Sequence, residues 1–573
     1  FAGLKIEEAR PKIVHKLRQK GLLVKEEEYA HNMALNSRGK GVIEPQIKLQ
    51  WFIDVNRPAV DWKGQRRSLR EVMRAVIEDG DIKIVPKHFE KVYYHWIDNL
   101  RDWCISRQIW WGHRVPVWYK DKEVYVGVRP PAGQGWQQDP DTLDTWFSSA
   151  LWTWSTLIDQ DLAKDYSLSL EDLLAKSVDY KTYHPTDVME TGWDILFFWV
   201  ARMVLATTYA TGQVPFKTVY LHGLVRTEAG KKMSKSDPDT IVDPMEVIPQ
   251  YGTDALRLAL VAGTTAGNDQ RLGKSKIVAN RNFANKLWNV ARYVQDSGNN
   301  PSTGLGAGSG VEPKSPSDHW ILNKLSISAT AIDKALANFH FSEAYELLYH
   351  FVWDDFADWY VEASKVELNA GVLHQVLEST LKLTHPFAPF ITETIWQNLG
   401  KKSLLAAELG PEIIKADRAQ ARQFEELKKI IAEARQIVTN VGVRKPTLLY
   451  ESSELIEQNK QLVKQLGRLG EVERVGRPST TLRVKGIRLT GTKAAAWLDI
   501  DHKTAKSYLD KLKSQAAAQQ SQIRTFENRL ANKAYVARAP KKLVEETRAQ
   551  LAEEKSKLET MNSELKTFEK SLR

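Results

Sequence analysis

A run rich in glycine, serine, proline and asparagine, residues 296–318, divides this chain of 573 residues into two unlike parts. Ahead of the run, apolar stretches typical of strands alternate with helical patterns, whereas residues 319–440 have a helical pattern throughout. Strands that alternate with helices predict a parallel α/β sheet, and sustained helical periodicity predicts a bundle. Because a chain of this length exceeds a single core, we expect an α/β domain, a linker and a helix bundle.

Local patterns in the first part predict individual elements. Residues 7–23 have the pattern of an amphipathic helix, and residues 64–80, "GQRRSLREVMRAVIEDG", predict a basic helix. We expect strand-like pieces within residues 41–55, and the apolar runs at 187–203 and 216–225 also predict strands. Ligands of parallel sheets bind beyond the carboxyl ends of the strands. The segment that follows the last of these runs is therefore a candidate binding loop.

The C-terminal part carries a heptad pattern. Apolar residues recur every seven positions within it: Val544, Leu551, Leu558, Leu565 and Leu572. A helical pattern at about 503–531 precedes them, and Pro540 is suited to begin the second helix. The pattern predicts an antiparallel coiled-coil hairpin. A coil that serves only for dimerisation is the alternative, because heptads alone do not identify a partner.

Composition narrows the functional classes. The net charge of +10 favours a polyanionic partner, nucleic acid before membrane. The richest apolar run, "ILFFWVARMVLA", is shorter than the roughly 18 residues of a membrane span and contains Arg202. Cys104 is the only cysteine, which excludes an internal disulfide and a zinc site made of thiolates. We expect a cytoplasmic protein with no membrane partner and no structural zinc, whose 19 tryptophans line large cores or pockets.

The stretch "GKKMSKSDPDT", residues 230–240, places three lysines among small, hydroxylated residues. Most runs of this kind are solvated surface loops. The alternative is an anion-binding loop, in which ammonium groups meet phosphate oxygens. Its position directly after a predicted strand, at the edge where ligands bind, favours the second interpretation.

Seven further stretches accompany this loop in order along the chain: "DWCISRQIWWGHRVPVWY" (102–119), "DTLDTWFSSALW" (141–152), "TGWDILFFWVARM" (191–203), "GTDALRLAL" (252–260), "FSEAYELLYHFVWDDFADWYVEASK" (341–365), "THPFAPFITETIWQ" (384–397) and "LANKAYVARAPKKLVEE" (530–546). Together with "KMSKS" (232–236), they resemble the valyl-tRNA synthetase family of class Ia over essentially the whole chain. The resemblance implies a Rossmann-type catalytic domain. It also implies activation of valine by ATP, bound with Mg²⁺ as a substrate complex, and transfer of valine to tRNA(Val).

The resemblance assigns the phosphate-binding role to the lysine loop. Lys235, supported by Lys232, would bind ATP and neutralise the charge that develops on the transferred and leaving phosphates. Lysines on a loop that closes during the reaction favour the transition state over the ground state. Ser234 and Ser236 would hydrogen-bond nearby phosphate, with loop solubility as the alternative for both.

The same resemblance assigns a nucleotide bed and an amino-acid pocket. His222 and Gly223 would hold the adenine, and Gly192 would let the backbone approach the nucleotide closely. Asp194 would accept a hydrogen bond from a ribose hydroxyl or from the ammonium group of valine. Two apolar residues would line the valine pocket: Trp146 and Ile195.

Several of these aromatic and apolar residues also have a structural interpretation. For Trp146 and Ile195 the alternative is plain core packing. In the predicted bundle, four aromatic residues could stack on bases, but their helical spacing favours a place in the core: Trp353, Phe356, Trp359 and Tyr360.

The resemblance also predicts the limits of the parts: the trailing part of an editing domain (1–55), the second half of the Rossmann-type catalytic domain (56–228), the KMSKS loop with stem-contact and connecting helices (229–295), the linker (296–318), an anticodon-binding helix bundle (319–440), a small α/β connector (441–501) and a coiled-coil tRNA-binding arm (502–573). The first class I signature, His-x-Gly-His, does not occur in the 573 residues. The sequence therefore looks like the C-terminal portion of a longer protein. We expect this isolated chain to be inactive in forming valyl-adenylate.

Two classes of function remain open from the sequence. The first is a valine–tRNA ligase that is N-terminally incomplete or one half of a split synthetase, with an N-terminal synthetase fragment supplied in trans. The second is a tRNA-binding module without catalysis. An isoleucine-type or leucine-type enzyme is a more distant alternative. The lysine loop and Asp194 favour a ligase, because a protein that only binds tRNA has no physical need for them.

Overall fold

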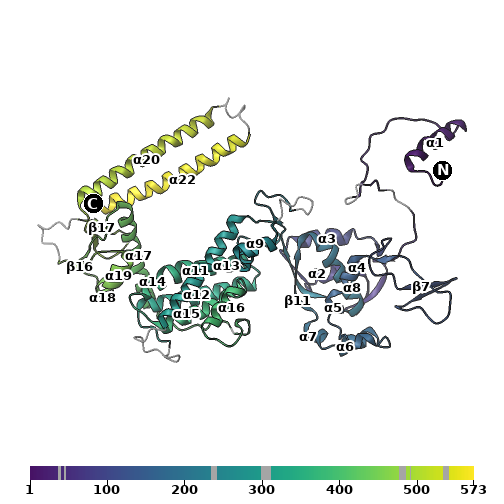
Figure 1. Cartoon of the computed structure of the whole chain (residues 1–573), viewed down its shortest axis with the longest axis horizontal. Helices are drawn as coiled ribbons and strands as arrows, with labels where there is room; N and C mark the ends of the chain where they lie inside the picture. Colours follow the sequence, from purple (N-terminus) through teal and green to yellow (C-terminus); the bar gives the residue numbers. More distant parts are fainter. Residues whose placement is uncertain are drawn as a thin grey trace.

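The computed structural model describes residues 1–36, 41–43, 47–233, 242–298, 311–408, 410–476, 486–490, 492–532 and 541–572. Three bodies follow one another along the long axis of the molecule: an α/β lobe, a helical body and a pair of long helices (Figure 1). Helix α1 (Ile6–Gln19) lies apart from the lobe at the end of an extended segment, and none of its residues is buried. The amphipathic helix expected in this region is therefore present, but its apolar side is uncovered.

The core of the α/β lobe is a three-stranded parallel sheet in the order β11–β12–β4. Its strands are β4 (Lys83–Val85), β11 (Thr186–Gly192) and β12 (Phe216–His222). Three helices share one apolar core with this sheet: α2 (Leu69–Glu78), α3 (Phe89–Asp98) and α8 (Ala201–Thr211). The connection from β11 through α8 to β12 is a βαβ unit, so the predicted parallel α/β sheet is confirmed.

Shorter elements surround this core. The strands are β1 (Phe52–Ile53) paired with β5 (Trp103–Cys104), β2 (Pro58–Trp62) with β3 (Gln65–Ser68), β6 (Ser106–Arg107) with β10 (Thr142–Leu143), β13 (Val225–Arg226) with β14 (Gln270–Arg271), and the sheet of β8 (Glu123–Val126), β7 (Val117–Lys120) and β9 (Gln137–Gln138). The helices are α4 (Thr145–Ala150), α5 (Trp152–Ser155), α6 (Leu170–Lys176), α7 (Val178–Tyr183), α9 (Pro244–Tyr251) and α10 (Thr253–Val261).

The strand predicted over residues 187–203 is wrong beyond Gly192. β11 ends there, and the chain continues through a 3-10 turn (Trp193–Ile195) and a π-helix (Leu196–Val200) into α8. The buried residues in this stretch recur at helical spacing: Leu196, Val200 and Val204. A continuous apolar run fits a buried strand or a buried helix equally well, which is why the pattern misled the prediction.

The basic helix predicted near residues 64–80 is confirmed as α2, which occupies the later part of this stretch. Arg66 and Arg67 lie in β3, and α2 begins only after Ser68. The Ser68 hydroxyl accepts a hydrogen bond from the N–H of Glu71, and the Glu71 carboxylate accepts one from the N–H of Ser68. This capping box sets the first turn of the helix.

The strand-like pieces expected within residues 41–55 are mostly absent. In the described part of that range, β1 is the only strand, and Val42 forms an isolated bridge with Leu35. The remaining described residues of this range belong to no strand.

The helical body is a bundle around one large apolar core. Its helices are α11 (Lys274–Gly298), α12 (Pro316–Ala337), α13 (Phe341–His350) with the π-helix that continues it (Phe351–Tyr360), α14 (Val361–Ser364), α15 (Ala370–Thr384), α16 (Pro389–Asn398) and α17 (Arg418–Val441). Phe356 and Tyr360 are 0% and 1% exposed, so their predicted place in the core is confirmed. Trp353 and Trp359 are half-buried at its margin, where lysine ammonium groups lie over both rings.

A small mixed sheet follows the bundle, in the order β16–β15–β18–β17. Its elements are β15 (Leu448–Tyr450), α18 (Glu454–Gln458), α19 (Lys460–Gly467), β16 (Val472–Arg474), β17 (Ile487–Arg488) and β18 (Ala496–Leu498). The apolar core of the bundle continues into this sheet.

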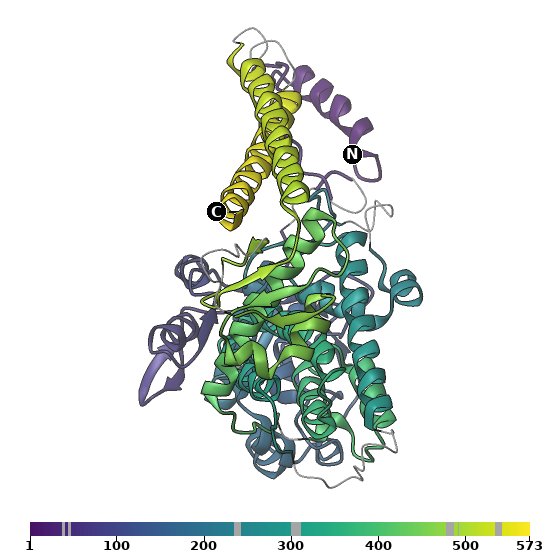
Figure 2. The same cartoon turned by 90° about the vertical axis from the view of Figure 1, so that its left-hand side faces the viewer.

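Two long helices end the chain, α20 (His502–Ala531) and α22 (Lys541–Leu572). They lie side by side and run in opposite directions (Figures 1 and 2). Ion pairs join the start of one helix to the end of the other, Lys513 to Glu569 and Lys555 to Glu527, each at 2.7 Å. Pro540, predicted to begin the second helix, lies outside the described residues. In the described ranges no helix is both long and apolar enough to cross a membrane.

Candidate functional site

The carboxyl ends of β11 and β12 bring three of the predicted residues together. Gly192 and His222 are paired in register across the two strands. A Cβ on Gly192 would lie 2.7 Å from Oδ1 of Asp194 and 3.5 Å from Cε1 of His222. The carboxylate and the imidazole therefore border the backbone of Gly192, and any larger residue there would displace the carboxylate.

Two polar side chains at this edge, His222 and Asp194, differ in their hydrogen-bonding partners. Nδ1 of His222 donates to the carbonyl oxygen of Gly223 at 2.7 Å, and its Nε2 lies 3.3 Å from Oε1 of Glu190. The ring is thus held at the end of β12. Asp194 is exposed, and its carboxylate makes no hydrogen bond or ion pair with any residue in the described ranges. A ligand with hydroxyl or ammonium donors can therefore reach it.

Gly223 is a point of close backbone approach. A Cβ on this residue would lie 1.8 Å from the carbonyl oxygen of Asn268, a distance that no side chain tolerates. Glycine is required here because two backbone segments meet, not because of an unusual φ angle.

The lysine loop begins as a tight hairpin. Arg226 and Lys232 form an isolated antiparallel bridge. Within the hairpin, the N–H of Thr227 donates to the carbonyl of Lys231 at 2.9 Å, and the N–H of Gly230 donates to that of Thr227 at 2.8 Å. Lys232 is exposed at its end. Three further predicted residues lie outside the described ranges: Ser234, Lys235 and Ser236.

The sequence motifs did not identify Asp269, whose side chain contacts both Trp193 in the turn after β11 and Arg226 at the start of the lysine hairpin. Its Oδ1 accepts from the N–H of Leu224 at 2.8 Å and from Nε1 of Trp193 at 3.0 Å, and its Oδ2 accepts from Nε of Arg226 at 2.6 Å. The N–H of Leu224, the indole of Trp193 and the guanidinium of Arg226 hold the pKa of this carboxyl below its usual value. The only sequence signal was the turn-forming triplet from Gly267 to Asp269, which does not reveal what the carboxylate will contact.

The two apolar candidates lie on adjoining elements. Trp146 is half-buried on α4, after the N-cap Asp144, and its ring stacks on Phe198 with centroids 6.0 Å apart. Ile195 is half-buried at the end of the 3-10 turn that follows Gly192. The structure thus connects Trp146 to this helical stretch through Phe198.

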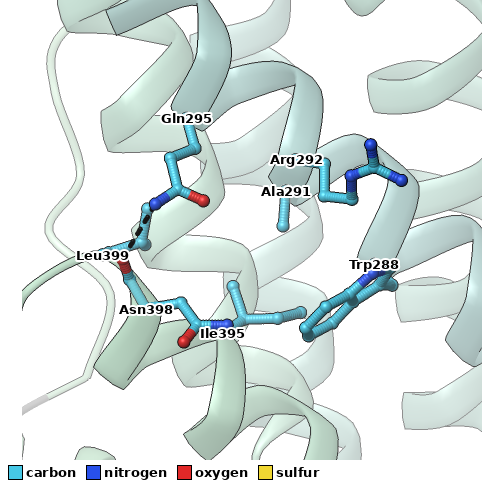
Figure 3. A pocket seen from close by; sticks show the side chains of 7 residues that line it. All are labelled: Trp288, Ala291, Arg292, Gln295, Ile395, Asn398 and Leu399. Atoms are coloured by element: carbon cyan, nitrogen blue, oxygen red, sulfur yellow. Dashed lines mark hydrogen bonds between the residues drawn. The ribbon is translucent and has the colours of Figure 1, made fainter. Parts of the chain in front are cut away.

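A second concave surface lies on the bundle, between α11 and α16. Figure 3 shows the residues that surround it: Trp288, Ala291, Arg292, Gln295, Ile395, Asn398 and Leu399. Gln295 donates from Nε2 to the carbonyl of Asn398 at 3.0 Å, which closes one side. The hollow encloses about 20 Å³, room for about one water molecule. A larger planar group would therefore lie on this surface rather than inside it.

The described ranges contain no cluster of three or more histidine, cysteine, aspartate or glutamate side chains arranged to hold a metal ion. The polar groups that the structure brings together at the sheet edge include the imidazole of His222, backbone amides, and the carboxylates of Asp194, Glu190 and Asp269. These groups suit a ligand that carries hydroxyl or amine donors and an aromatic base.

Three family profiles match consecutive parts of the chain. The tRNA synthetases of class I (I, L, M and V) match residues 5–132 and 129–273, the anticodon-binding domain of tRNA ligase matches 318–452, and the valyl tRNA synthetase tRNA binding arm matches 506–569.

Individual relatives match nearly the whole chain. A valine–tRNA ligase from Geobacillus stearothermophilus is 37% identical over 99% of this chain and 64% of its own length. One from Streptomyces coelicolor is 37% identical over 96% of this chain and 61% of its own length. The chain therefore spans less than two thirds of these relatives. Among solved structures, a ternary complex of LeuRS from Agrobacterium radiobacter K84 aligns with 57% of this chain at 20% identity and a TM-score of 0.45, too remote to support a conclusion.

Proposed function

Because this chain belongs to the valyl-tRNA synthetase family of class I, we propose that its α/β lobe activates valine with ATP and its helical parts bind tRNA(Val). One observation carries the proposal: Gly192, Asp194 and His222 meet at the carboxyl edge of a parallel sheet, next to the hairpin that begins the lysine loop. This edge is where α/β sheets bind nucleotides.

The nucleotide would lie across the ends of β11 and β12. The adenine lies against His222 and Gly223, and a ribose hydroxyl donates to the exposed carboxylate of Asp194. Lys232 and Lys235 reach the phosphates of ATP–Mg²⁺, with Ser234 and Ser236 as further donors. Their ammonium groups neutralise charge on the α-phosphate and on the leaving pyrophosphate.

Valine would bind beside the nucleotide. Its side chain packs against Trp146 and Ile195, which lie on adjoining elements at this edge. A pocket of this kind selects by size, and one methylene is worth only about 1–3 kcal/mol. The ammonium group of valine is the second candidate donor to Asp194.

The helical parts would bind the tRNA. A base can stack on the half-exposed ring of Trp288 while Arg292 pairs with phosphate and Asn398 reads a base edge, which is the manner in which single-stranded RNA is recognised. The paired helices α20 and α22 would form the coiled-coil arm that lies along the tRNA backbone. The net charge of +10 favours such a partner.

We further propose that an N-terminal synthetase fragment, supplied in trans, completes the lobe. β11 is an edge strand, so one side of its backbone has no strand partner in the described sheet. Four aromatic rings that contact one another in a row are also half-exposed, with Phe197 and Phe198 meeting edge to face: Trp96, Phe197, Phe198 and Trp146. Parallel sheets normally have both faces covered, and an uncovered edge strand is a surface on which a further strand can pair. A cytoplasmic location, where these substrates meet, agrees with a single half-buried cysteine.

Valine-dependent ATP–pyrophosphate exchange tests the proposal. The chain is assayed alone and after mixing with the part of the Geobacillus relative that it does not match. We expect exchange only in the mixture, and Lys235→Ala should lower it by about 10²–10³. The matched control, Lys217→Ala, removes an exposed lysine paired with Asp187 and should have no effect.

Other outcomes would point to the alternatives. Exchange that responds to isoleucine and not to valine would indicate a different amino-acid specificity. A chain that binds tRNA(Val) but neither binds ATP nor supports exchange in the mixture would be a tRNA-binding module without catalysis.

A further inference from the structure

The segment around Asp269 extends the sheet edge on which the proposed nucleotide site lies. The N–H of Gly267 donates to the carbonyl of Leu221 at 2.8 Å, and the N–H of Gln270 donates to that of Leu224 at 3.0 Å. β13 and β14 then pair in parallel, Val225 with Gln270. Residues 267–272 thus run alongside residues 221–226, which comprise the last two residues of β12 and the segment that follows it.

Both oxygens of the Asp269 carboxylate accept hydrogen bonds at this junction. Two donors reach Oδ1, and two nitrogens of Arg226 reach Oδ2 at 2.6 Å and 2.5 Å. A carboxylate offers about four acceptor positions. No position remains for a substrate, so this group acts on its neighbours and not on the reacting atoms.

Each donor belongs to a different part of the proposed site. Trp193 immediately precedes Asp194, and Leu224 immediately follows Gly223. Arg226 is the first residue of the hairpin and is bridged to Lys232. The same guanidinium lies 3.5 Å, through Nη1, from the carbonyl of Gly230 within that hairpin.

We propose that Asp269 is the positioning residue that holds the lysine hairpin, residues 226–232, at a set distance from the nucleotide bed. One charge-assisted ion pair and two hydrogen bonds join the carboxylate of Asp269 to the turn that contains Trp193 and to residues 224–226. The proposal deepens the proposed function and rests on it for the identity of the ligand, ATP. The ion pair and the hydrogen bonds of Asp269 are present in the structure without any ligand.

Asp269→Asn tests this coupling, since it keeps the shape of the side chain but removes the charge that pairs with Arg226. The matched control is Asp187→Asn, which breaks an exposed ion pair with Lys217 at the opposite ends of β11 and β12. Hydrogen exchange of the ligand-free chain should become about tenfold faster in peptides covering residues 224–233 of Asp269→Asn. It should not change in the control.

Ligand binding provides a second readout that general destabilisation would not produce. Calorimetric titration with ATP–Mg²⁺ and with adenosine should show about tenfold weaker ATP binding by Asp269→Asn, with adenosine binding within about twofold of the unaltered chain. Adenosine lacks the phosphates that the hairpin lysines reach, so only the ATP affinity depends on where the hairpin lies.

The outcomes separate the two proposals. Unchanged hydrogen exchange in residues 224–233, or equal losses of ATP and adenosine affinity, would overturn the positioning role. If the unaltered chain bound neither ligand, even after mixing with the part of the Geobacillus relative that it does not match, the nucleotide-binding function would fail. The hydrogen-exchange result would still decide whether Asp269 holds the hairpin.

Discussion

The helix bundle and the α/β lobe differ in how far several of their aromatic side chains are exposed to solvent. In the bundle, Trp320 and Trp396 are 1% and 2% exposed. Their indole N–H groups donate to Glu425 at 2.6 Å and to the carbonyl of Ser403 at 3.1 Å. In the lobe, Trp96, Trp152 and Phe198 are 46%, 49% and 47% exposed.

This difference in exposure indicates which of the two regions has surface left to bind another molecule. The bundle satisfies the indole donors of Trp320 and Trp396 with its own residues. Among its described residues, Nε of Arg281 on α11 is a buried donor without a hydrogen-bond partner. In the lobe several rings are half-exposed, and one edge of β11 has no strand partner in the described sheet. The indole N–H of buried Trp154 has no hydrogen-bond partner among the described residues. Surfaces of this kind are typical of regions that bind another polypeptide or a ligand. Buried tryptophans occur in both regions, Trp62, Trp103 and Trp154 in the lobe and Trp320 and Trp396 in the bundle, whereas further aromatic rings of the lobe lie at its surface.

The largest expected effect comes from emptying the bundle core. Trp320→Ala should lower the free energy of unfolding of the bundle by about 3–5 kcal/mol, since it removes a fully buried ring and the donor to Glu425. Trp96→Ala, which truncates a half-exposed ring stacked on Phe197, should cost about 1–2 kcal/mol. Differential scanning calorimetry measures both. Equal losses of unfolding free energy in the two variants would show that the bundle does not depend on its aromatic rings more than the lobe does.

A smaller effect is expected at a buried carboxylate of the bundle. Asp318 is 1% exposed and accepts from the hydroxyl of Tyr360 at 2.7 Å and from Nδ2 of Asn369 at 2.8 Å. Asp318→Ala would leave these donors unsatisfied, at a cost of about 2–3 kcal/mol. The exposed acid Asp187 of the lobe should lose less than about 1 kcal/mol on the same change. Urea unfolding of both variants would show whether the bundle depends on this network.

The bundle surface between α11 and α16 provides a third comparison. Trp288→Ala should weaken tRNA(Val) binding by about 1–3 kcal/mol if a base stacks on this ring. Trp152→Ala, an exposed tryptophan of the lobe, should leave tRNA affinity unchanged. Filter binding at a fixed salt concentration measures both constants, since phosphate contacts make the affinity depend on salt. Equal effects of the two variants would show that Trp288 has no special role.

The smallest effect concerns pH. Burial lowers the pKa of His184 in the lobe and of His374 in the bundle below the usual value near 6.5. The unfolded chain therefore binds more protons than the folded chain as the pH falls through about 6.5, and stability should decrease in that window. His184→Gln and His374→Gln should each reduce this decrease in the transition of their own region. Unfolding scans at pH 7.5 and 5.5, chosen about one unit on either side of 6.5, would detect it.

The sequence predicted the repetitive features of the fold well. The C-terminal helical patterns correspond closely to α20 and α22, because helical periodicity is a local property of the chain. The parallel sheet also followed from the order of elements. The run after Gly192 was assigned to a strand in error, since its apolar residues fit either kind of buried element.

The candidate site was predictable only in part. Gly192, Asp194 and His222 were chosen by motif, and the structure places them together, while their roles in binding a nucleotide stay predictions. Asp269 had no motif to identify it. Its partner Trp193 is 76 residues away in sequence, and Leu224 is 45 residues away. Contacts over such separations leave no periodic trace in the sequence.

The sequence by itself determined the order of the parts and the family, because these depend on local patterns and on motifs read in order. Tertiary structure alone decided which rings are buried and that Asn268 approaches Gly223 so closely that only glycine fits there. It also decided that the carboxylate of Asp269 joins the turn after β11 to the lysine hairpin. The physical reason is that burial and ion pairing depend on distances between distant segments, which exist only once the chain has folded.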